Sequence, residues 1–254
     1  MEGPVWDLEL GLMVAELGWV FTPFLFVELI LFMGSLVCNS ICTLAVGEKY
    51  SLTASQLMLS LSSGVRKYCL TDNINLDFGG AKVIKFQDDF TPIWQQKRHI
   101  IKEAVNNVED TIFIDADYQY LGTSHVISSR PPGVYSWKID PMQSQIVWHE
   151  KTLVPVMDGL SRVLNIKDWK KAVWVAPNLF QVKAGSSTPG FFDAWNQISF
   201  YLRDNKYKIN DGISIGLAAY VSGYTPKEDP DLFHLHKGLK HLFFGNWISD
   251  GSMT

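Results

Sequence analysis

Short apolar segments typical of buried strands alternate with segments of helical character through the first half of the chain. The strand-like segments are residues 41–46, 67–71, 82–86 and 111–114, and the helical ones are residues 51–62 and 93–108. Strands that alternate with helices predict an α/β fold with a mostly parallel central sheet flanked by helices. Such sheets bind ligands at the carboxyl ends of their strands. The residues that directly follow each strand are therefore the candidates for function.

Two carboxylates end the most apolar of these strands. Residues 111–114 have the composition of a strand buried on both faces, and Asp115 and Asp117 follow directly. Carboxylates beside a buried strand are costly unless a cation compensates their charge. Mg²⁺ and Mn²⁺ prefer oxygen ligands of this kind, and diphosphate oxygens and water can complete their octahedral shell. The alternative is a solvated turn, because D-x-D spacing by itself is a weak signal.

The stretch that leads into these carboxylates resembles the one before the metal motif of A-type glycosyltransferases. It consists of Lys97-Arg98-x-x-Ile101, then Glu109-Asp110-Thr111, then Ile112-Phe113-Ile114-Asp115-Ala116-Asp117. The resemblance covers residues 40–121 well and the later chain more loosely. It implies the GT-A (nucleotide-diphospho-sugar transferase) fold and metal-dependent, hexosyltransferase-like glycosyl transfer. The implied cofactor is Mn²⁺ or Mg²⁺, and the implied donor is a nucleotide-diphosphate sugar, with a UDP-sugar favoured.

The same resemblance implies which residues hold the donor. In the family the first strand and its loop bind base and ribose, and the matching positions here are Ala45, Val46, Gly47 and Tyr50. The metal motif corresponds to Asp115, Ala116 and Asp117. Either Lys97 or Arg98 is expected to reach the donor diphosphate, with Arg favoured for forked phosphate recognition. For each of these two residues the alternative is a charge on an exposed helix face.

A segment near the C-terminus carries histidines and lysines: Phe233-His234-Leu235-His236-Lys237-Gly238-Leu239-Lys240. In several A-type families, the glycogenin-like ones included, a C-terminal His adds a metal ligand, and a nearby Gly and Lys approach the diphosphate. His236 is the favoured ligand, His234 is second, and Lys240 is the expected diphosphate contact. The spacing departs from the glycogenin-like pattern, which leaves the ligand open. The alternative is a basic, partly exposed terminal segment.

The acceptor side of the predicted site is less clearly marked. Residues 185–190 and the aromatic segment that follows resemble a flexible acceptor-facing segment, in which Trp195 either stacks on a sugar or lies in the core. Asp211 precedes an apolar helix at residues 212–222, so it either caps that helix or takes a proton from the acceptor hydroxyl as the catalytic base. In a retaining enzyme Asp211 would position acceptor or donor instead. The expected acceptor is a saccharide or another hydroxyl compound.

The composition limits the partners and the location. A net charge of −4, from 22 basic and 26 acidic residues mixed along the chain, gives no basic stripe, so nucleic acid is not an expected partner. Residues 1–38 form an apolar extension, interrupted by Pro23, Glu28 and Gly34. Peripheral membrane contact, a packed extra helix and an extension that plays no part in the enzyme all stay open. We expect a cytoplasmic protein, with or without membrane association, whose residues 39–254 form a single catalytic domain.

Two other functions stay open from the residues alone. A nucleotidyltransferase also uses paired carboxylates and a divalent metal on a related scaffold, but it should have a glycine-rich basic loop after its first strand. Residues 46–50 (Val-Gly-Glu-Lys-Tyr) are a poor version of such a loop. A catalytically silent sugar-binding or membrane-associated scaffold would keep the fold without binding metal and nucleotide together.

Overall fold

The computed structural model of the chain describes residues 36–37, 39–121, 125–127, 130–146 and 150–242. The predicted N-terminal extension, residues 1–38, lies outside this part except for residues 36–37, so its role stays a prediction. Within the described residues, no helix combines the length and the apolar composition needed to cross a membrane.

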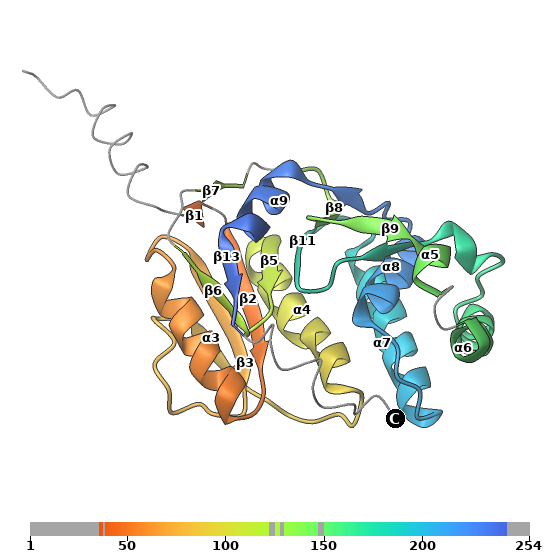
Figure 1. The fold of residues 1–254 in the computed structure, drawn as a ribbon, viewed down its shortest axis with the longest axis horizontal. Helices are drawn as coiled ribbons and strands as arrows, with labels where there is room; N and C mark the ends of the chain where they lie inside the picture. Colours follow the sequence, from red (N-terminus) through yellow and green to blue (C-terminus); the bar gives the residue numbers. More distant parts are fainter. Residues whose placement is uncertain (1–35, 38, 122–124, 128–129, 147–149, 243–254) are drawn as a thin grey trace, which may run out of the picture.

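A seven-stranded sheet in the order β12-β8-β11-β5-β2-β3-β4 forms the centre of the fold (Figure 1). β11 is antiparallel to both of its neighbours, β5 and β8, whereas every other pair of adjacent strands is parallel. The prediction of an α/β fold with a mostly parallel sheet is therefore confirmed. The strands of this sheet are β2 (Ser40–Ala45), β3 (Arg66–Thr71), β4 (Lys82–Lys85), β5 (Asp110–Ile114), β8 (Gly133–Ser136), β11 (Leu179–Lys183) and β12 (Lys227–Glu228).

Helices and three two-stranded sheets surround this centre. The helices are α3 (Glu48–Ser60), η1 (Ile93–Gln96), α4 (Lys97–Val108), α5 (Met142–Ile146), α6 (Glu150–Val163), η3 (Trp169–Lys171), α7 (Thr188–Asp204), α8 (Asp211–Ser222) and α9 (Pro230–Lys237). The small sheets pair β6 (Tyr118–Tyr120) with β13 (Leu239–His241), β9 (Ile139–Pro141) with β10 (Val173–Val175), and β1 (Leu36–Val37) with β7 (His125–Val126).

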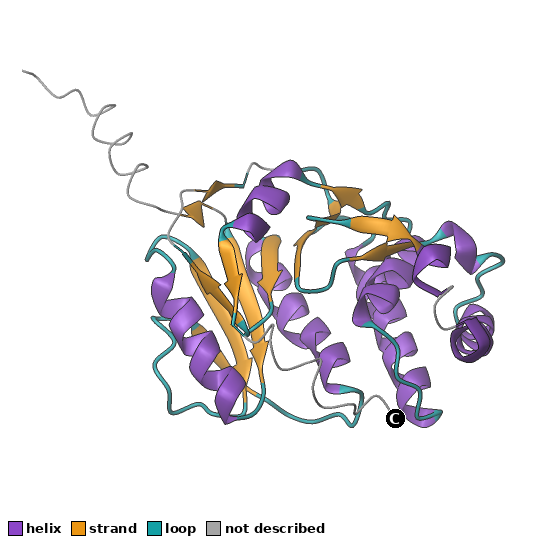
Figure 2. Cartoon of the chain, viewed as in Figure 1, coloured by secondary structure: helices purple, strands orange, loops and turns teal. Residues whose placement is uncertain are grey.

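Helices cover both faces of the central sheet, so its inner strands are apolar on both sides (Figure 2). Phe113 of β5 packs in a core with residues of α4, α7 and α8. Its neighbours Ile112 and Ile114 point to the opposite face and pack in a second core with residues of α3 and α9. Because successive side chains of a strand alternate between faces, the continuous apolar run at 111–114 follows from burial on both sides.

Most predicted elements are present, with shifted ends. The first helix, expected at residues 51–62, is α3 and begins at Glu48, while the helix expected at 93–108 starts with the 3-10 turn η1. The late helices expected at 191–204 and 212–222 are α7 and α8. Cys42 and Cys69 are buried free thiols. Cys38 lies outside the described residues.

Candidate functional site

The acidic pair lies at the carboxyl end of β5, between the central sheet and the small sheet of β6 and β13. The backbone N–H of Asp115 donates to the carbonyl of Asn178 at 3.0 Å, which ties the pair to the turn before β11. The carbonyl of Asp117 accepts from the backbone N–H of Leu242 at 2.9 Å, directly after β13. Backbone contacts from two distant parts of the chain thus fix both carboxylates, and Ala116 between them is buried.

Asp117 contacts a histidine that the sequence analysis did not single out. Its Oδ2 atom lies 3.0 Å from Nε2 of His241, and the ring of His241 packs edge-on against Tyr118 with centroids 4.9 Å apart. The Oδ1 atom of Asp117 is buried and has no hydrogen-bond partner among the described residues. A buried carboxylate oxygen without a partner is costly in a folded protein. A hydrogen-bond donor, a water molecule or a cation would satisfy this atom.

Asp115 shares a buried lysine with Asp211. Nζ of Lys97 lies 3.1 Å from Oδ1 of Asp115 and 2.5 Å from Oδ2 of Asp211, at the N-terminus of α8. Burial raises the pKa of Asp115 to about 6, with Asp211 and Asp117 adding to the increase and Lys97 opposing it. Burial lowers the pKa of Lys97, but the charges of Asp115 and Asp211 outweigh it and raise that pKa overall. Lys97 is thus a charged residue of the site.

Asp211 belongs to this cluster and does not cap α8. The side chain of the preceding residue, Asn210, is the cap, because its oxygen accepts from the backbone N–H of Gly212 at 2.7 Å. The side chain of Asp211 is 10% exposed and lies against Lys97. The structure therefore excludes Asp211 as the cap of α8 and places it in contact with Lys97, while its role as a base stays a prediction.

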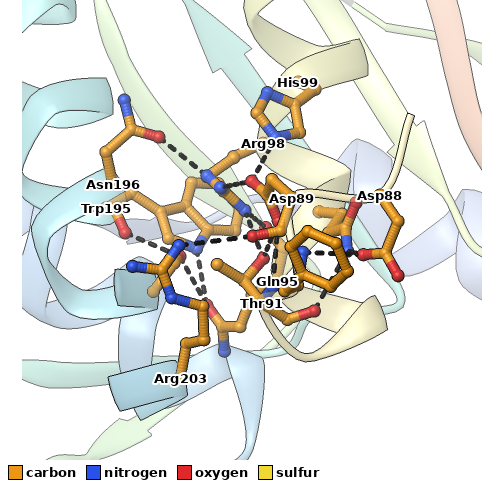
Figure 3. A network of polar contacts seen from close by, with 12 residues as sticks. Asp88, Asp89, Thr91, Gln95, Arg98, His99, Trp195, Asn196 and Arg203 are labelled. Carbon is orange, nitrogen blue, oxygen red and sulfur yellow. Dashed lines mark hydrogen bonds and ion pairs between the residues drawn. The ribbon is translucent and has the colours of Figure 1, made fainter. Parts of the chain in front are cut away.

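Arg98 does not lie at the acidic pair, which corrects the preference for it as the phosphate ligand. Its guanidinium is buried and forms an ion pair with Asp89, and its Nε donates to Asn196 of α7 at 2.7 Å (Figure 3). Nη1 donates to Thr91 at 3.2 Å and to the carbonyl of Gln95 at 2.8 Å. Arg98 therefore joins α4, the loop before η1 and α7. A guanidinium used in this way has no free edge for a diphosphate.

The Asp89 carboxylate in this network gives the protein an acid-sensitive contact. Burial raises its pKa, but hydrogen bonds from Thr91 and His99 and the charge of Arg98 outweigh burial and lower the pKa to about 2. A lowered pKa stabilises the fold above the unfolded value near 3.8, and the gain is lost as the pH falls from about 5 towards 2. We expect a loss of about 2 kcal/mol across this range. The free energy of unfolding, measured with urea, should fall less between pH 5 and pH 3 in Asp89→Asn than in wild type. Equal decreases in the two proteins would contradict this role of Asp89.

The residues after the first strand approach the acidic pair from the other side. Ala45 ends β2 and is buried, while Val46 and Gly47 lead into α3. Burial and then the charges of Asp117 and Asp115 raise the pKa of Tyr50, so its hydroxyl lies within electrostatic reach of both carboxylates. The backbone N–H of Gly47 donates to both carboxylate oxygens of Asp72, at 3.1 and 2.9 Å.

The structure shows where His236 and Lys240 lie. His236 stacks on the ring of Trp137, with centroids 3.8 Å apart and planes 10° apart, and it lies on helix α9. The exposed Lys240 lies on β13 beside His241, and adjacent side chains of a strand point to opposite faces. His241 is thus the histidine in contact with Asp117, while Lys240 points to the opposite face of β13. The role of His236 as a metal ligand stays a prediction.

The aromatic residues proposed for the acceptor side belong to the core. Trp195, Phe191 and Phe192 are fully buried or nearly so, and Nε1 of Trp195 donates to Oε1 of Gln95 at 2.8 Å. Of the two alternatives for Trp195, the structure therefore supports a place in the core. Exposed aromatic surface at the site comes instead from the half-buried Trp137, whose Nε1 donates to Asn178 at 3.0 Å.

The described residues fit a cation that a ligand helps to hold. In the described part of the chain, no group of three or more His, Cys, Asp or Glu side chains could hold a metal ion by itself. Asp117 nevertheless offers a buried oxygen without a partner, and Asp115 is partly exposed at 34% of its side chain. Mn²⁺ and Mg²⁺ commonly take one or two carboxylates and complete their shell with substrate phosphates and water. A cation at these two carboxylates would therefore need further oxygen ligands from a bound molecule or from water.

No protein-family model and no curated protein matches this chain. The fold and the site define its class: an α/β protein with a lysine-bridged acidic site at the carboxyl edge of a mostly parallel sheet. Any function has to account for the unpartnered oxygen of Asp117 and for the contact between Lys97 and two carboxylates.

Proposed function

We propose that this chain is a glycosyltransferase that moves a sugar from a nucleotide-diphosphate sugar to a hydroxyl acceptor, with a divalent cation at Asp115 and Asp117. The observation that carries the proposal is the buried Oδ1 atom of Asp117, which has no partner among the described residues. Asp117 lies just after the carboxyl end of a central strand, and sheets of this kind bind their ligands at that end. The strand order is compatible with the A-type fold, in which this edge of the sheet binds the donor.

Asp117 and Asp115 would hold the cation, and His241 would orient Asp117 through its Nε2 contact. When bound, the cation would neutralise charge on the leaving nucleotide diphosphate. Ala45, Val46, Gly47 and Tyr50 lie on the β2 side of the pair and are the proposed contacts for base and ribose. Asp211 is the carboxylate proposed for the acceptor side, where it would accept a proton or position the acceptor.

The contact between Gly47 and Asp72 disfavours the nucleotidyltransferase alternative. A loop that binds phosphate at the N-terminus of a helix leaves its backbone N–H groups free for the anion. Here the N–H of Gly47 donates to the carboxylate of Asp72, and Ser51 of α3 lies 3.4 Å from the same carboxylate. An acidic side chain thus occupies the place that a phosphate would take. The proposed donor site is therefore at the acidic pair.

A thermal-shift screen of UDP, GDP, CMP, ADP and dTDP, with and without Mn²⁺, tests the proposal on the full chain. A ligand at about 100 times its Kd stabilises the native state by about 2.7 kcal/mol. For a domain of this size we expect an increase in melting temperature of about 5 to 10 °C. One nucleoside diphosphate should give this increase only with Mn²⁺ present, with UDP expected. Folded protein that responds to none of them would favour a catalytically silent scaffold.

A further inference from the structure

The ammonium group of Lys97 has no hydrogen left for a substrate. Its Nζ contacts Oδ1 of Asp115 at 3.1 Å, Oδ2 of Asp211 at 2.5 Å and the carbonyl of Pro177 at 3.1 Å. A lysine ammonium has three N–H donors, so these three acceptors use all of them. The side chain is 4% exposed. Lys97 therefore does not bind the diphosphate in this arrangement, contrary to the expectation from its position in the sequence.

The same contacts place a fixed positive charge beside the carboxylate pair that would bind a cation. Lys97 divides its charge between Asp115 and Asp211, and the ring of Phe113 lies 4.5 Å from Nζ on the core side. In a partly buried site a cation at Asp115 would be repelled by the ammonium far more strongly than in water. A free Mn²⁺ ion thus competes with Lys97 for Asp115. The negative charge of a diphosphate would offset that repulsion.

We propose that Lys97 lowers the affinity of the Asp115 and Asp117 pair for a free divalent cation, so that the site retains the cation only together with a nucleotide diphosphate. This inference rests on the proposed function, because it requires a cation at the acidic pair. Asp211 is the second carboxylate that holds Lys97 in place while Asp115 turns to the cation. Lys97 and Asp211 are positioning residues. Their contact keeps the positive charge beside Asp115, so the cation stays bound only when the diphosphate is bound as well.

Titration of the full chain with Mn²⁺, followed by the electron paramagnetic resonance signal of the free ion, tests this role without nucleotide. Lys97→Met and Lys97→Gln both remove the charge, and Gln keeps an N–H donor for Asp115. We expect each to bind Mn²⁺ about tenfold more tightly than wild type, or tighter still. Lys97→Arg keeps the charge and should stay within about threefold of wild type. A purely structural role for Lys97 would not give this dependence on charge.

Two control variants establish what the titration reports. Lys82→Met removes the same charge from an exposed ion pair with Glu103, at a lysine that is 54% exposed, and it should leave the Mn²⁺ affinity unchanged. Asp117→Asn in the Lys97→Gln background should abolish the tighter binding, which assigns the bound ion to the acidic pair. Adding UDP should strengthen Mn²⁺ binding more in wild type than in Lys97→Gln, because the variant has less repulsion to relieve.

The outcomes separate this inference from the proposed function. Folded Lys97→Gln with wild-type or weaker Mn²⁺ affinity would overturn the inference, while Mn²⁺ binding with UDP that needs Asp117 would leave the proposed function in place. Wild-type protein that binds Mn²⁺ alone as tightly as it does with UDP would also overturn the inference, whether or not the variants fold. Absence of Mn²⁺ binding in wild type, with UDP present, would remove both.

Discussion

Under the proposed function, Asp117→Asn is expected to abolish Mn²⁺-dependent binding of UDP and to lower the rate of sugar transfer by about 100-fold or more. The substitution keeps the shape of the side chain but replaces a charged oxygen with a neutral amide. Oδ1 of Asp117 is the buried atom without a partner among the described residues, and Oδ2 contacts His241. The loss should appear as disappearance of the Mn²⁺-dependent thermal shift with UDP, while the unfolding transition of the protein without ligand is retained.

Asp204→Asn is the matched control for this charge change. Asp204 is 61% exposed and pairs with Arg203 on the surface of α7, and exposed ion pairs of this kind contribute little to stability. The control should keep both the thermal shift and turnover. A folded Asp117→Asn variant that still responds to UDP and Mn²⁺ would exclude Asp117 as a cation ligand.

Gly216→Ala is expected to destabilise the fold by about 3 kcal/mol or more. A Cβ atom at residue 216 would lie 1.7 Å from the carbonyl oxygen of Val173, so helix α8 could not keep its contact with β10. The obstacle is a backbone atom, which cannot rotate away as a side chain could. Urea unfolding of wild type and variant measures the effect. Because Asp211 begins α8, the shift should also separate Asp211 from Lys97 and reduce turnover of the remaining folded protein.

Gly190→Ala is the control for this substitution. Gly190 lies in α7, and the nearest atom to its added Cβ would be Cβ of Ser222 at 3.7 Å, which is ordinary van der Waals contact. Ala in a helix is favoured over Gly by about 1 kcal/mol, so this variant should be as stable as wild type or more so. Equal free energies of unfolding for Gly216→Ala and Gly190→Ala would contradict the prediction, because α8 would then move away from β10 without loss of stability.

Much of the sheet was predictable because its signals are local. The strand at 111–114 is a continuous apolar run, and the carboxylates of Asp115 and Asp117 follow it within three residues. β2 and α3 likewise come from adjacent segments. β11 was missed, although it pairs with β5 along its whole length. Its antiparallel pairing joins segments about 70 residues apart, and the apolar side chains of residues 179–183 do not show which strand they will meet.

The location of the basic residues could not be predicted for a geometric reason. Lys97 and Arg98 are neighbours at the start of one helix, where successive side chains point about 100° apart. One therefore faces the acidic pair and the other faces Asp89 and α7. Residue type does not show which of the two enters the site. Arg98 was preferred as the phosphate contact because of its chemistry, but in the fold it forms an ion pair with Asp89. Only the rotation of α4 against the sheet decides which one enters the site.

Neighbouring residues are enough to predict the alternation of strands and helices, and the position of Asp115 and Asp117 at the end of a buried strand. Which residues contact that pair depends on how distant segments pack together. His241 reaches Asp117 because β13 pairs with β6, and Asp211 reaches Lys97 because α8 packs on β10 through Gly216. These contacts join residues that are 124 and 114 positions apart, and they follow from packing and strand pairing across the whole fold.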